Sequence, residues 1–243
     1  MLFRSIPLVI ASGNAGKIRE FAALLASLPI EIRSQPEGLE VEETGASFAE
    51  NARLKARAVA QATGCWALAD DSGLAVAALG GAPGVHSARY AASDQERIAR
   101  LLRELAAASS AAPAAPAFQA PAPSSAAATP AERSGLTPGE QDDDRSAADS
   151  PSPAPPLDRS ARFTAALAVA DPSGRIRLEV EGHCPGLILE APRGEGGFGY
   201  DPVFLVPELG LTFAEMDKAS KARIGHRGRA FALLEPGLRE LLA

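Results

Sequence analysis

The sequence predicts an α/β fold, and three observations support this prediction. A short apolar run at residues 8–11 suits a strand buried on both faces, and apolar residues at helical spacing follow it to about Leu28. A second helical pattern runs from about residue 47 to Ala62. Residues 175–181 alternate between charged and apolar side chains, which is typical of an antiparallel strand with one solvent-exposed face.

The composition bounds the class of protein. The 243 residues suffice for one ordinary domain or two small ones, and the net charge of −6 argues against a nucleic-acid partner. The two cysteines, Cys65 and Cys184, lie far apart and indicate neither a disulfide framework nor a zinc site. The sequence shows no secretory signal and no apolar run of about 18 residues. We therefore expect a cytoplasmic protein without a membrane partner.

The first strand leads into a glycine-containing loop, Ser12-Gly13-Asn14-Ala15-Gly16-Lys17, at the start of a helix. In such an arrangement, backbone N–H groups and the helix N-terminus can hold phosphate. The spacing is not that of a Walker A loop, because two residues separate Gly13 from Gly16 and Ile18 follows Lys17. The loop is either a phosphate-binding loop or a plain connection between a strand and a helix.

A short strand at residues 30–32 precedes the first of two acidic clusters, which includes Glu42. A capping box at residues 47–50 then opens the second helix. On that helix Asn51 and Lys55 are four residues apart, so they share a face and could point at one ligand. Alternatively, Lys55 belongs to a solvated face, as most lysines do.

The second acidic cluster is the stretch Asp70-Asp71-Ser72-Gly73, which interrupts an apolar run. The pattern predicts a strand that delivers two carboxylates to its end, followed by a tight turn. Adjacent carboxylates repel one another, and a divalent cation with oxygen ligands relieves that repulsion. The stretch is therefore either part of a metal site or a solvated turn.

A loop at residues 80–90 precedes another capping box, residues 93–96, and an amphipathic helix. From about residue 106 to residue 159, alanine, proline and serine dominate. A segment of this composition cannot bury enough apolar surface to offset its ordering entropy, so we expect a disordered insert at 106–159. The whole chain, residues 1–243, is then a single domain with an insertion in a surface loop.

The second half of the chain predicts a hairpin and then a glycine-rich loop. Strands at residues 162–170 and 175–181 flank a turn. Residues 194–199 match the spacing G-x-G-x-x-G, but a strand-like run follows them instead of a helix, which excludes a dinucleotide-binding fingerprint. The rings of Phe198 and Tyr200 could pack on a flat base, or they could be core residues in a turn.

The C-terminal part concentrates positive charge in an acidic protein. A capping box at residues 212–215 predicts a short helix, and residues 231–241 predict an amphipathic stretch kinked at Pro236. Between them lie the basic side chains Lys218, Lys221, Arg223, His226, Arg227 and Arg229. This cluster could receive a triphosphate or could form a solvated helix face.

Together the motifs offer receptors for phosphate, for a metal ion and for a flat base. The combination predicts a nucleoside triphosphate site with Mg²⁺. Hydrolysis is the expected reaction, because no motif indicates a pocket for a second substrate.

The order of these motifs resembles that of the inosine triphosphate pyrophosphatase family, over essentially the whole chain apart from the insert. The motifs are Ser12–Lys17, Glu42–Gly45 with Glu50–Ala52 and Lys55-Ala56, Ala69–Leu74, Gly80–Gly84 with Ser87–Tyr90, Gly196–Pro202, and His226–Gly228. Six motifs in register are far more specific than any one of them.

The resemblance implies hydrolysis of non-standard purine nucleotides, namely ITP, dITP and XTP, to the monophosphate and pyrophosphate. It implies an elongated mixed sheet with flanking helices and two lobes around a central cleft, usually in a homodimer. Asp71 would be the general base with Asp70 in support, and Glu42 and Asp71 would hold Mg²⁺. The substrate-binding residues would be Ser12, Gly13, Asn14, Ala15, Gly16, Lys17, Lys55, Ser72, Phe198, Gly199, Tyr200, Asp201, Lys221, His226 and Arg227.

Two features depart from the family pattern: Gly225 stands where a serine is common, and the insert is longer than the usual connection. Two other functions stay open. A Maf-like nucleotide pyrophosphatase catalyses the same reaction, although Ser12-Gly13-Asn14 differs from an S-x-S-x-R phosphate loop. A nucleotide-binding module without turnover is the second, although it would not need so many acids beside a triphosphate.

Overall fold

One mixed sheet organises the protein in the computed structural model, which describes residues 6–110 and 157–242. Its strands are β1 Ile6–Ala11, β2 Ile30–Ser34, β3 Trp66–Val76, β4 Ser160–Ala170, β5 Ile176–Ile188, β6 Phe204–Val206 and β7 Leu211–Thr212. Their order is β2-β1-β3-β4-β5-β6-β7. β1 pairs in parallel with β2 and β3, and the remaining pairs are antiparallel. The predicted α/β class with a mixed sheet is confirmed.

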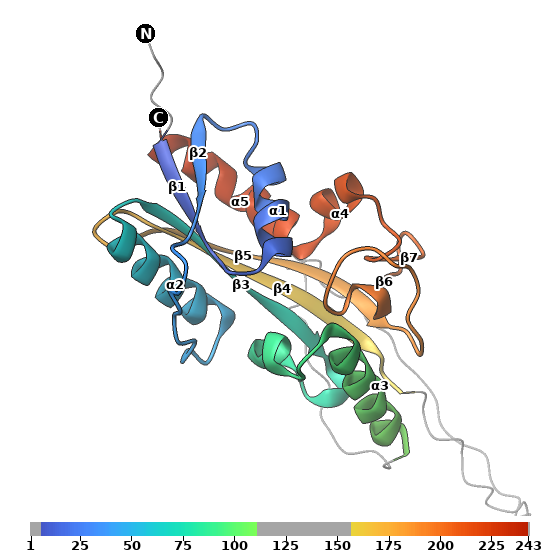
Figure 1. Cartoon of the computed structure of the whole chain (residues 1–243). Helices are drawn as coiled ribbons and strands as arrows, with labels where there is room; N and C mark the ends of the chain where they lie inside the picture. The colour runs from blue at the N-terminus through green and yellow to red at the C-terminus, as the bar shows by residue number, and fades with distance from the viewer. Residues whose placement is uncertain (1–5, 111–156, 243) are drawn as a thin grey trace, which may run out of the picture.

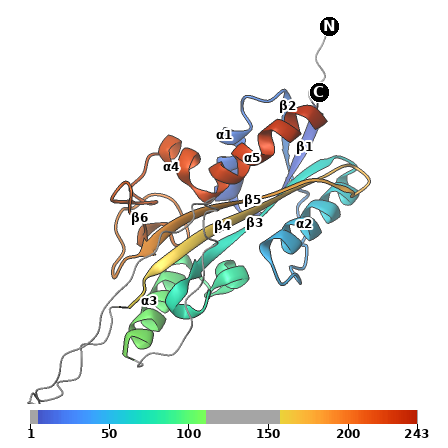
Figure 2. The same cartoon turned by 180° about the vertical axis from the view of Figure 1, so that it is seen from behind.

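Helices cover both faces of this sheet (Figures 1 and 2). The α-helices are α1 Ala15–Leu24, α2 Phe48–Thr63, α3 Asp94–Ser110, α4 Lys218–Ile224 and α5 His226–Leu241. Short 3-10 helices occur at η1 Ala77–Leu79, η2 Gly84–Arg89 and η3 Asp201–Val203. α2 lies on one face, and α1 and α5 lie on the other. None of the helices in the described ranges is long and apolar enough to cross a membrane.

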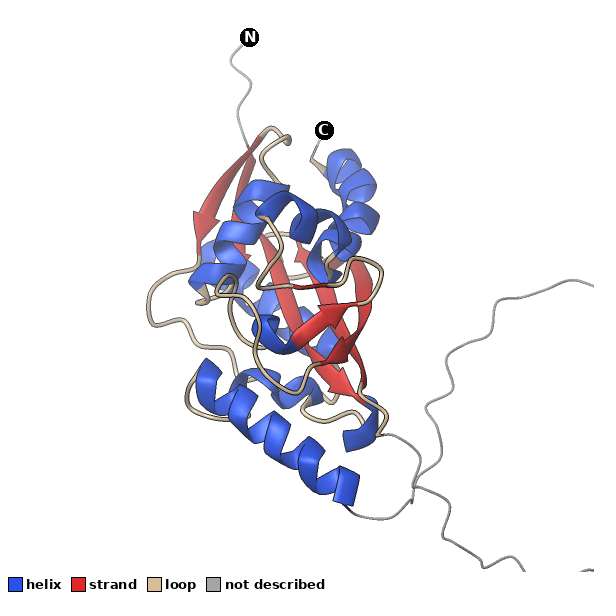
Figure 3. Cartoon of the chain, turned by 90° about the vertical axis from the view of Figure 1, so that its right-hand side faces the viewer, coloured by secondary structure: helices blue, strands red, loops and turns tan. Residues whose placement is uncertain are grey.

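The alternation of side chains along the strands decides which helix each residue meets. On β1, Leu8 and Ile10 pack with α1 and α5, whereas Val9 and Ala11 pack with α2. The α2 face is lined mostly by alanine, so this helix packs close to the sheet. A third apolar cluster joins α3, the far end of β4 and the β5–β7 region. Figure 3 shows α3 at the end of the molecule opposite the termini. The long central strands therefore connect two separately packed ends.

The acidic stretch lies inside a strand, so the predicted strand end and tight turn are wrong. β3 continues through Asp70 and Asp71 to Val76, and it pairs with β4 over this whole length. Asp70 lies opposite Leu167, and Asp71 lies opposite Ala166. Backbone pairing with a partner almost 100 residues away overrides the local turn preference of Asp-Asp-Ser-Gly.

Two other boundaries differ from the prediction. Thr212 ends β7 and residues 213–215 form a turn, so no helix opens there, although Glu215 accepts from the Thr212 amide as a capping box would require. Asp217 is the residue that caps α4. The predicted start of the insert, residue 106, lies inside α3, which continues to Ser110. At the other end of the insert, the Arg159 guanidinium donates to backbone carbonyls just beyond β5. The rest of the predicted insert, 111–156, lies outside the described residues.

Candidate active site

The loop after β1 is shaped by its own side chains. Asn14 caps α1, and its Oδ1 accepts from the amides of Gly16 at 2.8 Å and Lys17 at 3.1 Å. The Asn14 amide in turn donates to Ser12 Oγ at 3.1 Å. The β1–β3 ladder ends at Ala11 and Ala69, so Asp70 follows directly beyond it, and the Lys17 ammonium group donates to the Asp70 carbonyl at 3.4 Å. The predicted phosphate loop and the acidic stretch are therefore neighbours.

Asp70 points toward α1 and α5. Its side chain is 0% exposed, and Oδ2 lies 2.9 Å from Lys17 Nζ and 3.1 Å from Arg227 Nε. Burial alone would raise the pKa of Asp70, but the charges of Lys17 and Arg227 outweigh it and hold that pKa well below its ordinary value. Asp70 is therefore ionised, and it serves as the fixed anion between two cations.

Asp71 points to the opposite face, toward α2, because successive side chains of a strand alternate. Its carboxylate accepts from Asn51 Nδ2 at 3.2 Å and from Lys55 Nζ at 2.8 Å. Asn51 and Lys55 share a face as predicted, and both contact Asp71; that they point at one ligand stays a prediction. Burial raises the pKa of Asp71, although Lys55 opposes this shift. The two neighbouring acids thus have environments that move their pKa values in opposite directions.

A residue that the sequence reasoning missed also reaches this side. Glu43 accepts from Lys55 Nζ at 2.9 Å and from Arg89 Nη1 at 2.6 Å. Glu42, the carboxylate expected to hold metal, is exposed. Lys55 thus joins Glu43 and Asp71, so two carboxylates already converge on one positive charge. This donor set fits a hard divalent cation. Within residues 6–110 and 157–242, no group of three or more histidine, cysteine or acidic residues is arranged to hold a metal ion.

The basic C-terminal cluster divides between a cavity and the rest of the fold. Lys221 lies 2.6 Å from Asp201 and 3.1 Å from Glu20, and Arg227 lies 2.8 Å from Glu20. Arg229 instead donates to a carbonyl of β5. Glu20 was not predicted as a site residue, although it follows Lys17 by three positions and so shares its helix face.

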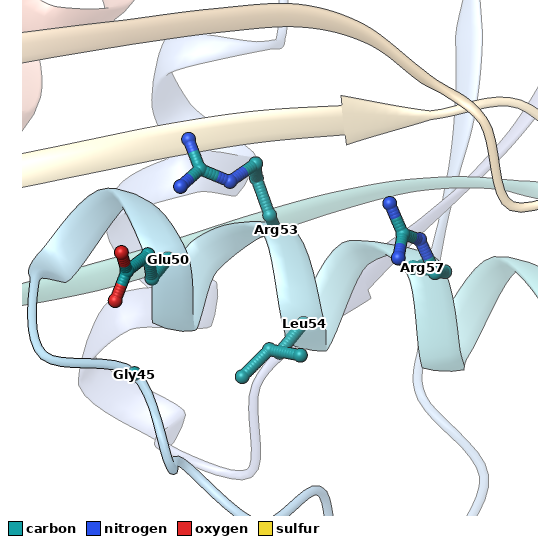
Figure 4. Close-up of a pocket in the computed structure, with 5 residues that line it drawn as sticks. All are labelled: Gly45, Glu50, Arg53, Leu54 and Arg57. Atoms are coloured by element: carbon teal, nitrogen blue, oxygen red, sulfur yellow. The ribbon is translucent and has the colours of Figure 1, made fainter.

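These cations line a cavity of about 400 Å³ between α1, α4 and the start of α5. Its lining includes Gly16, Glu20, Phe198, Phe213, Lys221, His226 and Arg227. A second, smaller hollow of about 250 Å³ lies on the outer face of α2, and Figure 4 shows its residues. That hollow contains none of the predicted site residues, and its Arg53 is paired with Glu179 at 2.6 Å. The larger cavity is therefore the candidate site for a base or sugar.

His226 lies deep in the cavity wall. Its ring stacks on Phe163 at 4.7 Å between centroids and lies 6.0 Å from Phe213. Burial lowers the pKa of His226 well below its ordinary value, so the ring is neutral. Nδ1 has no hydrogen-bond partner among the residues that the structure describes. A buried polar atom without a partner is rare in folded proteins, so this ring nitrogen marks the cavity wall as unusual.

The aromatic residues of the glycine-rich loop separate into two roles. Phe198 lies on the phosphate loop, since a Cβ built on Gly16 would come within 2.9 Å of its ring. Lys221 Nζ is 4.8 Å from the Phe198 ring centroid. Tyr200 is only 4% exposed, belongs to the apolar cluster near α3 and donates its hydroxyl to the Ser87 carbonyl at 3.0 Å. Of the two rings, Phe198 lines the cavity, and Tyr200 is a core residue.

Comparison with known proteins shows the family to which the chain belongs. The sequence model of the Ham1 family matches residues 8–139 and 119–236. A dITP/XTP pyrophosphatase of Synechococcus sp. (strain CC9311) is 53% identical over 97% of this chain and 91% of its own length. The dITP/XTP pyrophosphatase of a Nostoc species (strain PCC 7120) is 44% identical over 97% of this chain and 96% of its own length.

Solved structures show the same fold. A HAM1 protein from Coxiella burnetii matches with a TM-score of 0.71 and 37% identity, and the match covers 97% of this chain and 99% of that one. The Ham1 protein of Staphylococcus aureus matches with a TM-score of 0.68 and 32% identity, over 97% and 99% of the two chains. The resemblance found in the sequence motifs is confirmed, and the chain belongs to the Ham1 family.

Proposed function

We propose that the chain is a nucleoside triphosphate pyrophosphatase that hydrolyses ITP, dITP and XTP to the monophosphate and pyrophosphate, and so removes them from the nucleotide pool. The observation that carries this proposal is the division of the acidic pair. Asp70 is bound to Lys17 and Arg227 on one face, while Asp71 lies against Lys55 on the other. The names of the relatives support the substrate class.

Asp71 is the proposed general base. Burial raises its pKa above the ordinary value of an aspartate, which makes its carboxylate a stronger acceptor for a proton from water. The water oxygen forms a bond to phosphorus, the α,β-phosphoanhydride bond breaks, and pyrophosphate leaves with the electron pair. Asp70 keeps Lys17 and Arg227 in place beside the reacting phosphates. Ser72 assists by accepting from Arg227 Nη2 at 2.7 Å.

Mg²⁺ is the proposed metal, held by Asp71 and Glu42, with Glu43 as a further carboxylate within reach of Lys55. When bound, it would neutralise charge on the phosphates and lower the pKa of a coordinated water. The few carboxylates suit Mg²⁺, which usually takes one or two from the protein and completes its shell with phosphate oxygens and water.

Discrimination among purines is assigned to the cavity wall. A 6-oxo purine presents an acceptor where ATP presents an amino group. Arg227 and backbone amides would satisfy an oxygen and would leave an amino group facing donors, which is costly in a buried site. Phe198 would stack on the base, and Asp201 would hold Lys221 toward the ligand.

A panel of nucleotides tests the proposal. The protein is incubated with ITP, XTP, dITP, ATP or GTP and Mg²⁺, and pyrophosphate is measured, with parallel reactions in EDTA. We expect release from the first three nucleotides, little release from ATP and GTP, and loss of release in EDTA. Binding of ITP without release of pyrophosphate would support a binding module instead. Equal turnover of all five nucleotides would contradict a role in removing non-standard purines.

Three further features belong to the same proposal: a homodimer, a cytoplasmic location, and one catalytic domain that residues 106–159 interrupt. The mass of the particle in solution tests the first, and a dimer is expected. A variant that lacks residues 111–156 tests the last, because a single domain should keep its activity without them.

A further inference from the structure

The loop that carries Phe198 is hydrogen-bonded to the start of α3. The Gly199 amide donates to Asp94 Oδ2 at 2.7 Å, a contact between residues 105 positions apart. Asp94 is the first residue of α3, which packs in a different apolar cluster from α1 and most of α5. Neither the sequence motifs nor the proposed reaction assigns a role to Asp94.

Asp94 is itself held in a fixed orientation. Its other oxygen, Oδ1, lies 2.6 Å from Arg97 Nη1, and Arg97 Nε donates to the Ala91 carbonyl at 3.1 Å. The Arg97 side chain is 23% exposed and the Asp94 side chain is 45% exposed, so geometry and not burial holds this contact. Arg97, anchored to the Ala91 carbonyl just before α3, therefore orients the carboxylate that receives the Gly199 amide.

The contact acts on the residue that faces the cavity. Gly199 adopts a φ of +63°, and the preceding amide, that of Phe198, donates to Asp201 Oδ2 at 2.8 Å. Two successive amides thus donate to two carboxylates, one on either side of the Phe198 Cα. This double attachment fixes the direction in which the Phe198 ring leaves the backbone, toward Gly16 and Lys221.

We propose that Asp94 is a positioning residue, which places Phe198 over the phosphate loop and the cavity by accepting the Gly199 amide. The proposal rests on the function proposed above for the cavity, and it adds that the N-terminus of α3 sets the affinity for the base. Asp94 touches no reacting atom, so it acts on substrate binding and leaves the chemical step unchanged.

Steady-state kinetics with ITP test this role in three variants. Asp94→Ala removes the acceptor, and we expect KM to rise by roughly 3- to 10-fold with kcat within about 2-fold of the parent, the pattern of lost uniform binding. Asp94→Asn keeps an amide oxygen that can accept from Gly199, so its KM should stay within about 2-fold. Glu96→Ala is the matched control, because Glu96 caps the same helix by accepting from the Ser93 amide and does not contact the loop.

Hydrogen exchange of the peptide that contains residues 194–201 supplies a readout independent of activity. Exchange should accelerate in Asp94→Ala and stay unchanged in Glu96→Ala. An equal rise in KM for Asp94→Ala and Glu96→Ala would show that the helix end, and not the contact, matters, and would overturn the proposal. Unchanged exchange in Asp94→Ala would also overturn it. If the parent protein does not turn over ITP, the proposed function fails, whereas the exchange experiment still decides whether Asp94 holds the loop.

Discussion

Arg227 Nε donates to Asp70 Oδ2 at 3.1 Å, and this contact joins residues 157 positions apart. Arg227 is the second residue of α5, and Asp70 lies in the middle of β3. Both side chains are buried, so each charge depends on the other and on its remaining partners, Glu20 for Arg227 and Lys17 for Asp70. The pair connects the wall of the cavity to the strand that carries the proposed base.

Replacing Arg227 should therefore affect both stability and selectivity. Arg227→Ala leaves Asp70 with Lys17 as its remaining cation, and the loss of a partner from a buried pair costs about 3 kcal/mol or more. We also expect the ratio of kcat/KM for ITP over ATP to fall toward one, measured beside urea unfolding. Arg227→Lys keeps a charge but cannot reach Asp70, Glu20 and Ser72 at once, so it should be intermediate. An Arg227→Ala protein with an unchanged preference for ITP would show that selectivity arises elsewhere.

Neutralising the two acids should have opposite effects on stability. The pKa of Asp70 is lowered in the folded protein, so its ionised form stabilises the fold above the unfolded pKa and this stability is lost as pH falls. Asp70→Asn should thus lower the free energy of unfolding by about 3 kcal/mol at pH 7. The pKa of Asp71 is raised, so its ionised form does not stabilise the fold, and Asp71→Asn should unfold at or above the parent midpoint. Equal destabilisation of both variants in urea would contradict the assigned environments.

His226 should make stability depend on pH in the acidic range. Burial lowers its pKa in the folded protein, and Arg227, Lys221 and Lys17 also oppose protonation, whereas Asp70 favours it. Because the unfolded chain binds the proton more readily, stability is complete above the unfolded pKa and is lost as pH falls below it. Between pH 7.5 and 5.5, one such histidine contributes a loss of about 1.4 kcal/mol.

Urea unfolding at these two pH values measures this contribution. The parent should lose about 1.4 kcal/mol more than His226→Gln over the interval. His86→Gln is the matched control, because His86 is exposed on η2 and should leave the loss unchanged. The same pH dependence in His226→Gln as in the parent would assign the effect to another group.

Gly182 should tolerate no side chain. It lies in β5 directly beneath α5, and a Cβ at this position would come within 2.2 Å of the Ala230 amide nitrogen and 2.4 Å of the His226 carbonyl. Gly182→Ala must push α5 away from the sheet, at a cost of about 1–3 kcal/mol in unfolding experiments. Gly13→Ala, where an added Cβ meets nothing within 4 Å, should unfold like the parent.

Local patterns predicted the parts of the fold that depend on local interactions. The strand at residues 8–11 and the capping boxes at Ser47 and Ser93 follow from residues close in sequence, and the structure contains them. The course of β3 through Asp70 and Asp71 could not be predicted in this way, because pairing with β4 decides it. The same reason explains why the capping box at residues 212–215 failed, since the Thr212 segment pairs with β6.

In the candidate site too, contacts between residues close in sequence could be predicted, and contacts between distant residues could not. Helical spacing predicted that Asn51 and Lys55 share a face, and both contact Asp71 in the structure. Glu20, Glu43 and Asp94 were missed, since each contacts the site through residues distant in sequence. Tyr200 could not be distinguished from Phe198 by composition, and only packing against the α3 end shows that it is a core residue.

The most direct test of this account is the rate at which Asp71→Asn releases pyrophosphate from ITP with Mg²⁺, in protein whose urea midpoint is at or above that of the parent. If Asp71 is the base that accepts the proton from water, the rate should fall by about 10²- to 10⁴-fold while ITP still binds. A folded Asp71→Asn protein that hydrolyses ITP at close to the parent rate would contradict the division of roles between Asp70 and Asp71.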